Sequence, residues 1–161
     1  MFLHFSRSKL PNISLLAAMS LTEWSERTIR RRLADGTLKC ADDNRVSNKT
    51  LICFESIEQD VCIPLSSDDI ELIKMADAGD AEAQNDLALL FWAHDKTKSA
   101  LYWLESAAKQ NFPDAMQELG YCYLLGEGVE KDENVAVMWI AKAASLGHAI
   151  ARVQMEALAS N

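Results

Sequence analysis

Apolar residues in the second half of the chain recur at helical spacing. Two sets of three lie four residues apart: Ala83, Leu87 and Phe91, and then Ala115, Leu119 and Tyr123. A four-residue spacing places side chains on one face of an α-helix. The pattern therefore predicts helices over about 80–93 and 113–125.

A second pattern repeats with all of its residues identical. The two sets are Ala100, Trp103, Ala107 and Ala108, and then Ala136, Trp139, Ala143 and Ala144. It predicts helices over about 97–110 and 132–146, and it predicts that both tryptophans lie in the core. Each repeating unit is thus a pair of helices, and a third copy begins at Gly147. The second unit also has a loop, Gly126-Glu127-Gly128-Val129, that the first unit lacks.

The second unit resembles a SEL-one-like repeat, which is a tetratricopeptide-like α/α unit. The residues that carry the resemblance are Leu119, Gly120, Tyr123, Gly126, Gly128, Val129, Lys131, Asp132, Ala136, Trp139, Ala143, Ala144 and Gly147. The resemblance covers about 79–159 and departs in the first unit, whose loop is shorter. It implies an α-solenoid that binds proteins and has no catalytic activity.

The same resemblance implies a concave groove along the first helix of each unit. We expect this groove to be acidic with aromatic anchors, and aromatic residues near the centre of a patch are typical of binding hot spots. The residues expected in it are Glu82, Asn85, Asp86, Leu89, Trp92, Asp114, Gln117, Glu118, Tyr121 and Leu124. The alternative is that Trp92 and Tyr121 pack against the N-terminal part of the chain.

The first half contains a short helix with arginines on one face. Ser25 is a natural N-cap, and Asp35-Gly36 ends the helix. Ile29 and Leu33 share the inward face, and the opposite face carries Arg27, Arg30 and Arg31. The apolar run around 15–19 predicts a preceding helix. We expect a hairpin turn at Asp43-Asn44, and then a helix from about 47 through Ile57.

This order of elements resembles the winged helix-turn-helix of the MerR and excisionase type over about 14–57. The resemblance depends on Ser25-x-Arg27-Thr28-Ile29-Arg30-Arg31 and on Asp35-Gly36-x-Leu38. It implies duplex DNA binding, with guanidinium groups on guanine edges or phosphates. The candidate contacts are Ser25, Arg27, Thr28, Arg30, Arg31, Lys39, Arg45 and Lys49. A solvated basic face, or ion pairs from the arginines to the acidic repeats, are the alternatives.

Charge divides the chain in the same place. The first 50 residues have 9 Lys/Arg and 5 Asp/Glu, whereas the remaining 111 have 7 and 19. Such a split is typical of a polyanion-binding half joined to a half with another role, although two ordinary solvated surfaces would also produce it. We expect a mainly α fold with a winged helix-turn-helix at 1–60, a connection and first solenoid helix at 61–78, and repeats at 79–161.

No pattern in the sequence indicates catalysis, a cofactor or a metal. The four cysteines have no C-x-x-C spacing and the three histidines are scattered, so we expect free thiols in a cytoplasmic protein and no metal site. The apolar run 13–21 is too short to span a membrane, which needs about 20 apolar residues.

Two functions remain open. The first is a DNA-binding regulator or adaptor whose repeats bind a protein partner. The second is a protein-interaction scaffold in which the N-terminal module caps the solenoid. Ile150, Val153, Ala157 and Leu158 leave the end of the repeats partly apolar, so we also expect a patch that supports self-association, such as a homodimer.

Overall fold

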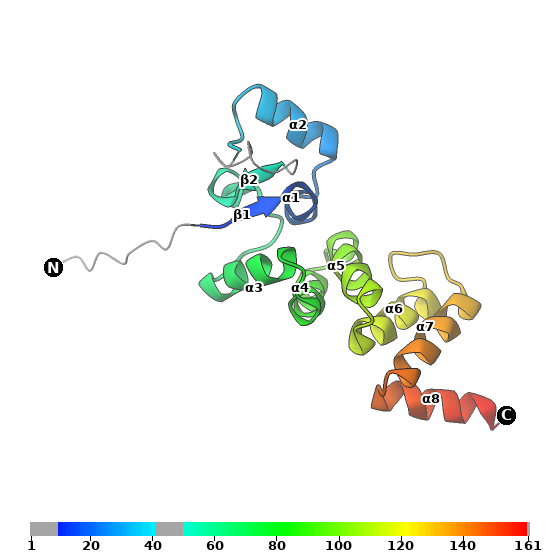
Figure 1. Ribbon diagram of the computed structural model, residues 1–161. Coiled ribbons are helices and arrows are strands. Elements are labelled where there is room, and N and C mark those ends of the chain that lie inside the picture. The colour runs from blue at the N-terminus through cyan, green and yellow to red at the C-terminus, as the bar shows by residue number, and fades with distance from the viewer. Residues whose placement is uncertain (1–9, 41–49, 161) are drawn as a thin grey trace. The chain divides into compact units, whose positions relative to one another are not determined.

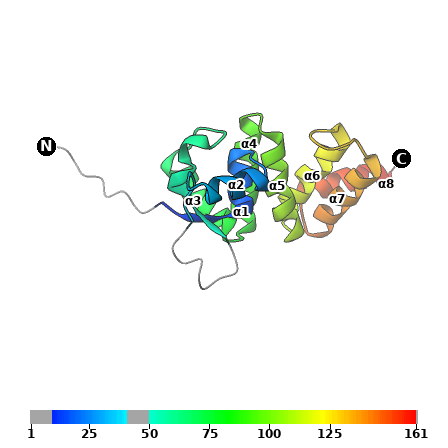
Figure 2. The ribbon, with the colours of Figure 1, turned by 90° about the horizontal axis from the view of Figure 1, so that it is seen from above.

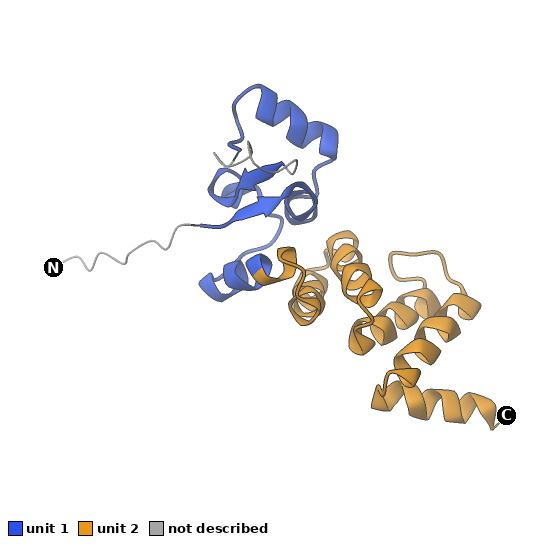
Figure 3. Cartoon of the chain, viewed as in Figure 1, with its two compact units in different colours: residues 1–74 blue, residues 75–161 orange. Residues whose placement is uncertain are grey.

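The structure is a computed structural model that describes residues 10–40 and 50–160 (Figure 1). It divides into two compact units, Met1–Lys74 and Met75–Asn161 (Figure 3). The described residues are mainly helical, as the predicted fold class requires, while the winged helix-turn-helix expected within 1–60 stays a prediction. Within the described ranges, no helix has the length and apolar character needed to cross a membrane.

The first unit combines a small sheet with two helices. Strand β1 (Asn12–Ser14) pairs antiparallel with β2 (Leu51–Cys53), and an isolated bridge adds Cys40 to the other side of β2. Helix α1 (Leu15–Thr22) and helix α2 (Glu26–Ala34) lie between the strands in sequence. The helix pair predicted for this segment is therefore present.

Local hydrogen bonds explain where these two helices begin and end. The side chain of Ser14 accepts from the N–H of Ala17 at the start of α1, and Ser25 does the same for Thr28 at the start of α2. Glu23 ends α1 in the left-handed conformation, with φ of 57°. Only three residues separate the helices, so the chain turns sharply between them.

The predicted helix through Ile57 is wrong. The structure has β2 there, followed by two short 3₁₀ turns, Phe54–Ser56 and Glu58–Asp60. Ile52 lies opposite Ile13 across the sheet and both are fully buried, so burial against a distant strand overrides the local helical preference. The predicted turn at Asp43-Asn44 lies outside the described residues.

Helices follow one another along the rest of the described chain (Figures 1 and 2). They are α3 (Ser67–Asp77), α4 (Ala81–Ala93), α5 (Thr97–Lys109), α6 (Pro113–Leu125), α7 (Glu133–Ser145) and α8 (Ala149–Ala159). The two predicted helix pairs correspond to α4–α5 and α6–α7, and their bounds agree with the predictions within two residues.

Turn residues set the length of each connection. Gly126 ends α6 with φ of 76°, and Gly128 has φ of 71°, a region that glycine adopts without strain. A Cβ atom at Gly128 would lie only 2.5 Å from Cγ2 of Thr97 on α5, so this loop packs directly against the first repeat. In the first repeat, by contrast, residues 94–96 alone join α4 to α5.

The two equivalent tryptophans differ in burial. Trp103 is 2 % exposed, as the repeat predicts. Trp139 is only half-buried, and the Nζ atom of Lys142 lies 4.9 Å from the centre of its ring. The expectation of a fully buried Trp139 is therefore wrong. In the described chain α6, α7 and α8 follow α5, whereas α8 alone follows α7. One side of α7 is therefore left uncovered, and Trp139 on this helix is less buried than Trp103 on α5.

Helices α6 and α7 approach closely because Gly120 lies between them. A Cβ atom at Gly120 would lie 2.7 Å from Cγ1 of Ile140 and 3.2 Å from the carbonyl oxygen of Ala136. The equivalent pair in the first repeat is Ala88 on α4 with Leu104 on α5, and both of these side chains are fully buried. The pairs have complementary sizes: glycine is used opposite isoleucine, and alanine opposite leucine.

This complementarity predicts a rescue. The single change Gly120→Ala gains about 1 kcal/mol of helix propensity but costs about 1–3 kcal/mol through overpacking, so we expect a net loss of about 1 kcal/mol in the free energy of unfolding. Adding Ile140→Leu recreates the alanine–leucine pair of the first repeat, Ala88 with Leu104, and restores the free energy of unfolding. Urea denaturation of the two single variants and the double variant measures the coupling. Additive effects of the two substitutions would contradict this account.

Candidate functional site

A groove lies between α4 and α6, the first helices of the two repeating units. Its volume is about 420 Å³. The lining residues are Leu89, Trp92, Glu118, Tyr121, Cys122, Leu125 and Glu127. We call this set the α4–α6 groove.

Helical periodicity explains which side chains face the groove. Glu118, Tyr121 and Leu125 are spaced i, i+3 and i+7, so they share one face of α6. Leu89 and Trp92 are spaced i, i+3 on α4 and form the opposite wall. Both walls belong to regular helices, which fix the backbone positions of these residues.

The groove has an apolar surface with aromatic residues at its centre. Leu89 is 46 % exposed and Leu125 is 63 % exposed, whereas Trp92 and Tyr121 are half-buried. The hydroxyl of Tyr121 accepts a hydrogen bond from Nε2 of Gln154 on α8, which fixes the orientation of the ring. Tryptophan and tyrosine are typical of binding hot spots, and exposed apolar side chains gathered around them form a candidate interaction surface.

Two carboxylates give the groove its charge. Burial raises the pKa of Glu118, and the nearby charges of Asp114 and Glu127 raise it further, while His148 acts in the opposite direction. Asp114 already has a partner, because its Oδ1 lies 3.4 Å from Nε2 of His148. Among the described residues, neither Glu118 nor Glu127 forms an ion pair with a lysine or arginine.

Cys122 lies at the bottom of the groove and is 1 % exposed. Burial, together with the charges of Glu118 and Glu127, raises the pKa of its thiol to about 12. Its Sγ donates a hydrogen bond to the carbonyl oxygen of Glu118 at 3.1 Å. The thiol therefore stays protonated near neutral pH and serves as packing rather than as a nucleophile.

The structure brings together only some of the residues that the sequence places in one groove. Four of the ten line the α4–α6 groove: Leu89, Trp92, Glu118 and Tyr121. Three others are exposed but lie outside its lining: Glu82, Asp86 and Asp114. The last three face elsewhere: Asn85 and Gln117 are buried, at 6 % and 4 % exposure, and Leu124 lines a second pocket.

The reason lies in helical phase. Gln117 and Leu124 are seven residues apart and share a face of α6 that turns toward α8, where Nε2 of Gln117 donates to Oε1 of Gln154 at 3.4 Å. Shifting both positions by one residue gives Glu118 and Leu125, which do face the groove. Sequence reasoning missed Leu125, although the i, i+3, i+7 series was available to find it. It also missed Cys122 and Glu127.

The second pocket, of about 400 Å³, lies among α6, α7 and α8. It includes Ala157 and Leu158 from the end of the repeats, and Leu158 is 55 % exposed. Ile150 and Val153 on the same helix are 59 % and 64 % exposed. The apolar patch expected there is thus present, while its role in self-association stays a prediction.

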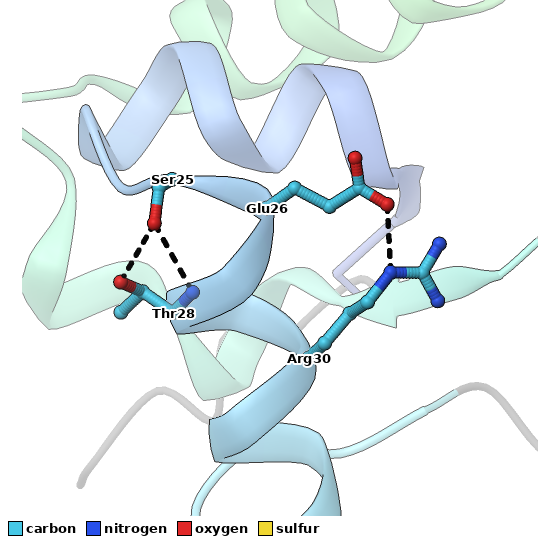
Figure 4. A network of polar contacts seen from close by, with 4 residues as sticks. All are labelled: Ser25, Glu26, Thr28 and Arg30. Carbon is cyan, nitrogen blue, oxygen red and sulfur yellow. Dashed lines mark hydrogen bonds and ion pairs between the residues drawn. The ribbon is translucent and has the colours of Figure 1, made fainter.

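Helix α2 presents the basic residues of the first unit. Arg27 and Arg31 are exposed, whereas Nε of Arg30 donates to Oε1 of Glu26 at 2.7 Å (Figure 4). The Oγ atom of Ser25 accepts from the backbone N–H of Thr28 at 3.2 Å, also seen in Figure 4. Ser25 thus has a structural role as the helix cap.

The remaining candidate DNA contacts are distributed differently. Lys39 is exposed, and its backbone N–H donates to Oγ of Ser56 at 3.3 Å. Arg32, which is not one of the candidates, lies over the ring of Trp24 at 3.9 Å. Arg45 and Lys49 lie outside the described residues. Within the described part of the chain, no three His, Cys, Asp or Glu side chains gather as metal ligands would.

Two comparisons with known proteins identify the same kind of repeat in the second compact unit, Met75–Asn161. The family model described as Sel1 repeat matches residues 81–112 and 113–148. A Sel1 repeat protein from Oxalobacter formigenes is 34% identical, with 53% of this chain and 68% of that chain covered and a TM-score of 0.50. The two family matches lie within the second unit and lend no support to the helix-turn-helix resemblance of 14–57.

A further similar structure is a protective antigen present in uropathogenic Escherichia coli strains, which displays an SLR fold. It is 37% identical, with 52% of this chain and 18% of that chain covered and a TM-score of 0.48. No curated protein matches the chain.

The burial of Cys122 predicts its reactivity. At pH 8 the exposed thiol of Cys40 reacts with iodoacetamide within minutes, whereas Cys122 stays unmodified, because its thiol is protonated and covered. Urea at denaturing concentration makes the two reactivities equal. Mass spectrometry of labelled peptides distinguishes the sites. Equal labelling of both cysteines in the folded protein would mean that the bottom of the groove is open.

Proposed function

This chain belongs to the Sel1 repeat family, and from that membership we propose that it is a protein-interaction scaffold whose α4–α6 groove binds a segment of a partner protein. Sel1 repeats are typical of interaction scaffolds rather than enzymes. One observation carries the assignment to this groove: exposed Leu89 and Leu125 flank the half-buried rings of Trp92 and Tyr121 on two rigid helices.

Physical chemistry favours protein binding over other uses of this groove. Large apolar side chains that remain exposed in a folded protein gain free energy when a partner covers them. Because the helices already hold the backbone of these residues in place, binding orders side chains alone and loses no backbone entropy of the groove. The thiol of Cys122 is buried and protonated, which disfavours its use as a nucleophile.

A second candidate function rests on α2 in the first unit. Arg27 and Arg31 are exposed on this helix, and α1 precedes it across a three-residue connection, which is the order of elements in a helix-turn-helix. Exposed guanidinium groups on one helix suit phosphate and guanine contacts. A DNA-binding regulator is therefore the alternative proposal, with the repeats as its protein-binding part.

The groove proposal predicts a loss of peptide binding without a loss of fold. Peptides are selected from a random library on the intact chain, and the strongest binder is titrated by calorimetry. Each exposed leucine that a peptide covers contributes about 1 kcal/mol, so Leu89→Ser with Leu125→Ser weakens binding about thirtyfold. The matched control is Leu16→Ser with Leu146→Ser, two leucines of similar exposure that line neither pocket. Equal losses in the two variants would contradict the proposal.

The DNA proposal predicts a salt-dependent interaction. Three phosphate contacts from Arg27, Arg30 and Arg31 give a slope of about −2.7 in a plot of log affinity against log salt concentration. Replacing all three with alanine abolishes binding to mixed duplex fragments in fluorescence anisotropy, while circular dichroism stays unchanged. If the triple variant binds duplex as well as the parent chain, the DNA proposal is wrong and the scaffold proposal is unaffected.

A further inference from the structure

We infer that the α4–α6 groove selects a partner segment in which a lysine or arginine adjoins a large apolar residue. The inference rests on the proposed function and adds to it the chemistry of the partner. Its basis is the combination of two carboxylates, two aromatic rings and two exposed leucines in one groove.

The first step concerns the unneutralised charge of Glu118. This side chain is half-buried on the same face of α6 as Tyr121 and Leu125, so water solvates its carboxylate incompletely. A partly desolvated carboxylate is stabilised by a cation held close to it. The described residues form no ion pair from a lysine or arginine to Glu118, and the imidazole of His148, which also acts on Glu118, lies 3.4 Å from Oδ1 of Asp114. A cation from a partner fills this place.

The second step concerns the surroundings of that cation. Glu127 lines the same groove, so two negative charges act on one cationic group. The rings of Trp92 and Tyr121 also line it, and aromatic faces attract ammonium and guanidinium groups. The aliphatic stem of a lysine or arginine suits contact with such rings, while its charged end reaches the carboxylates.

The third step concerns the residue next to the cation. Leu89 and Leu125 are the most exposed apolar side chains of the groove, and they belong to opposite walls. Covering them requires an apolar side chain from the same segment. The compact unit that holds the groove, residues 75–161, has 13 acidic against 6 basic residues, and this charge also attracts a cationic segment and repels an acidic one.

Peptide selection tests this chemistry directly. Peptides are selected from a random library on the native chain, on Glu118→Gln with Glu127→Gln, and on the control Glu130→Gln with Glu156→Gln. The control removes the same amount of charge from exposed positions outside the groove. We expect peptides from the native chain and the control to be enriched in Lys or Arg beside a large apolar residue. On the groove variant, the apolar enrichment persists and the cationic enrichment disappears.

A titration then measures the contribution of the cation. Exchanging the lysine or arginine of a selected peptide for norleucine weakens binding about tenfold on the native chain and the control, a value between those of exposed and buried charge pairs. On the groove variant the same exchange changes the affinity less than twofold. An equal effect on all three proteins would overturn the inference.

The two proposals fail in different ways. Enrichment of purely apolar or acidic peptides on the native chain overturns the cation preference and leaves a binding groove in place. If the native chain enriches no peptide beyond what the Leu89→Ser and Leu125→Ser variant enriches, the groove itself is not a binding site, and both proposals fail.

Discussion

The close approach of paired helices is the constraint on which the second unit depends. Small residues occupy equivalent positions near the starts of α4, α6 and α8: Ala83, Ala115 and Ala151 are all nearly or fully buried. Gly120 meets the same requirement opposite Ile140. When backbones pack this closely, a helix cannot rotate without a clash, so the phase of each helix is set by its neighbour. That phase decides which residues of α4 and α6 face each other across the groove.

The residues that line the α4–α6 groove stand at positions where the two repeats have different residues rather than the same ones. Leu89 is equivalent to Tyr121, and Trp92 to Leu124, yet Trp92 lines the α4–α6 groove and Leu124 does not. The repeated alanines provide a frame, and the residues between them give each wall its own chemistry. The two walls of the groove are therefore chemically unlike.

Helix positions were predictable from sequence because four-residue spacing and turn residues are local signals. The strand at Leu51–Cys53 was not, since its partner β1 lies far away in the sequence and three apolar residues carry no period. The groove was predictable only in part. Trp92 and Tyr121 followed from the repeat, but choosing Leu125 over Leu124 required the exact phase of the side chains around α6. The unpaired state of Glu118 depends on which cations other helices bring near it.

The loop after α6 has a consequence for how the repeats unfold. Gly128 rests against Thr97 and Leu101, so the loop of the second repeat is packed on a helix of the first. In repeat proteins, cooperativity depends on such contacts between neighbours. The second repeat cannot open without exposing part of α5, and the two are thereby coupled into one cooperative transition. Because Glu127 belongs to this loop, its contribution to the negative charge of the groove depends on the loop remaining packed on the first repeat.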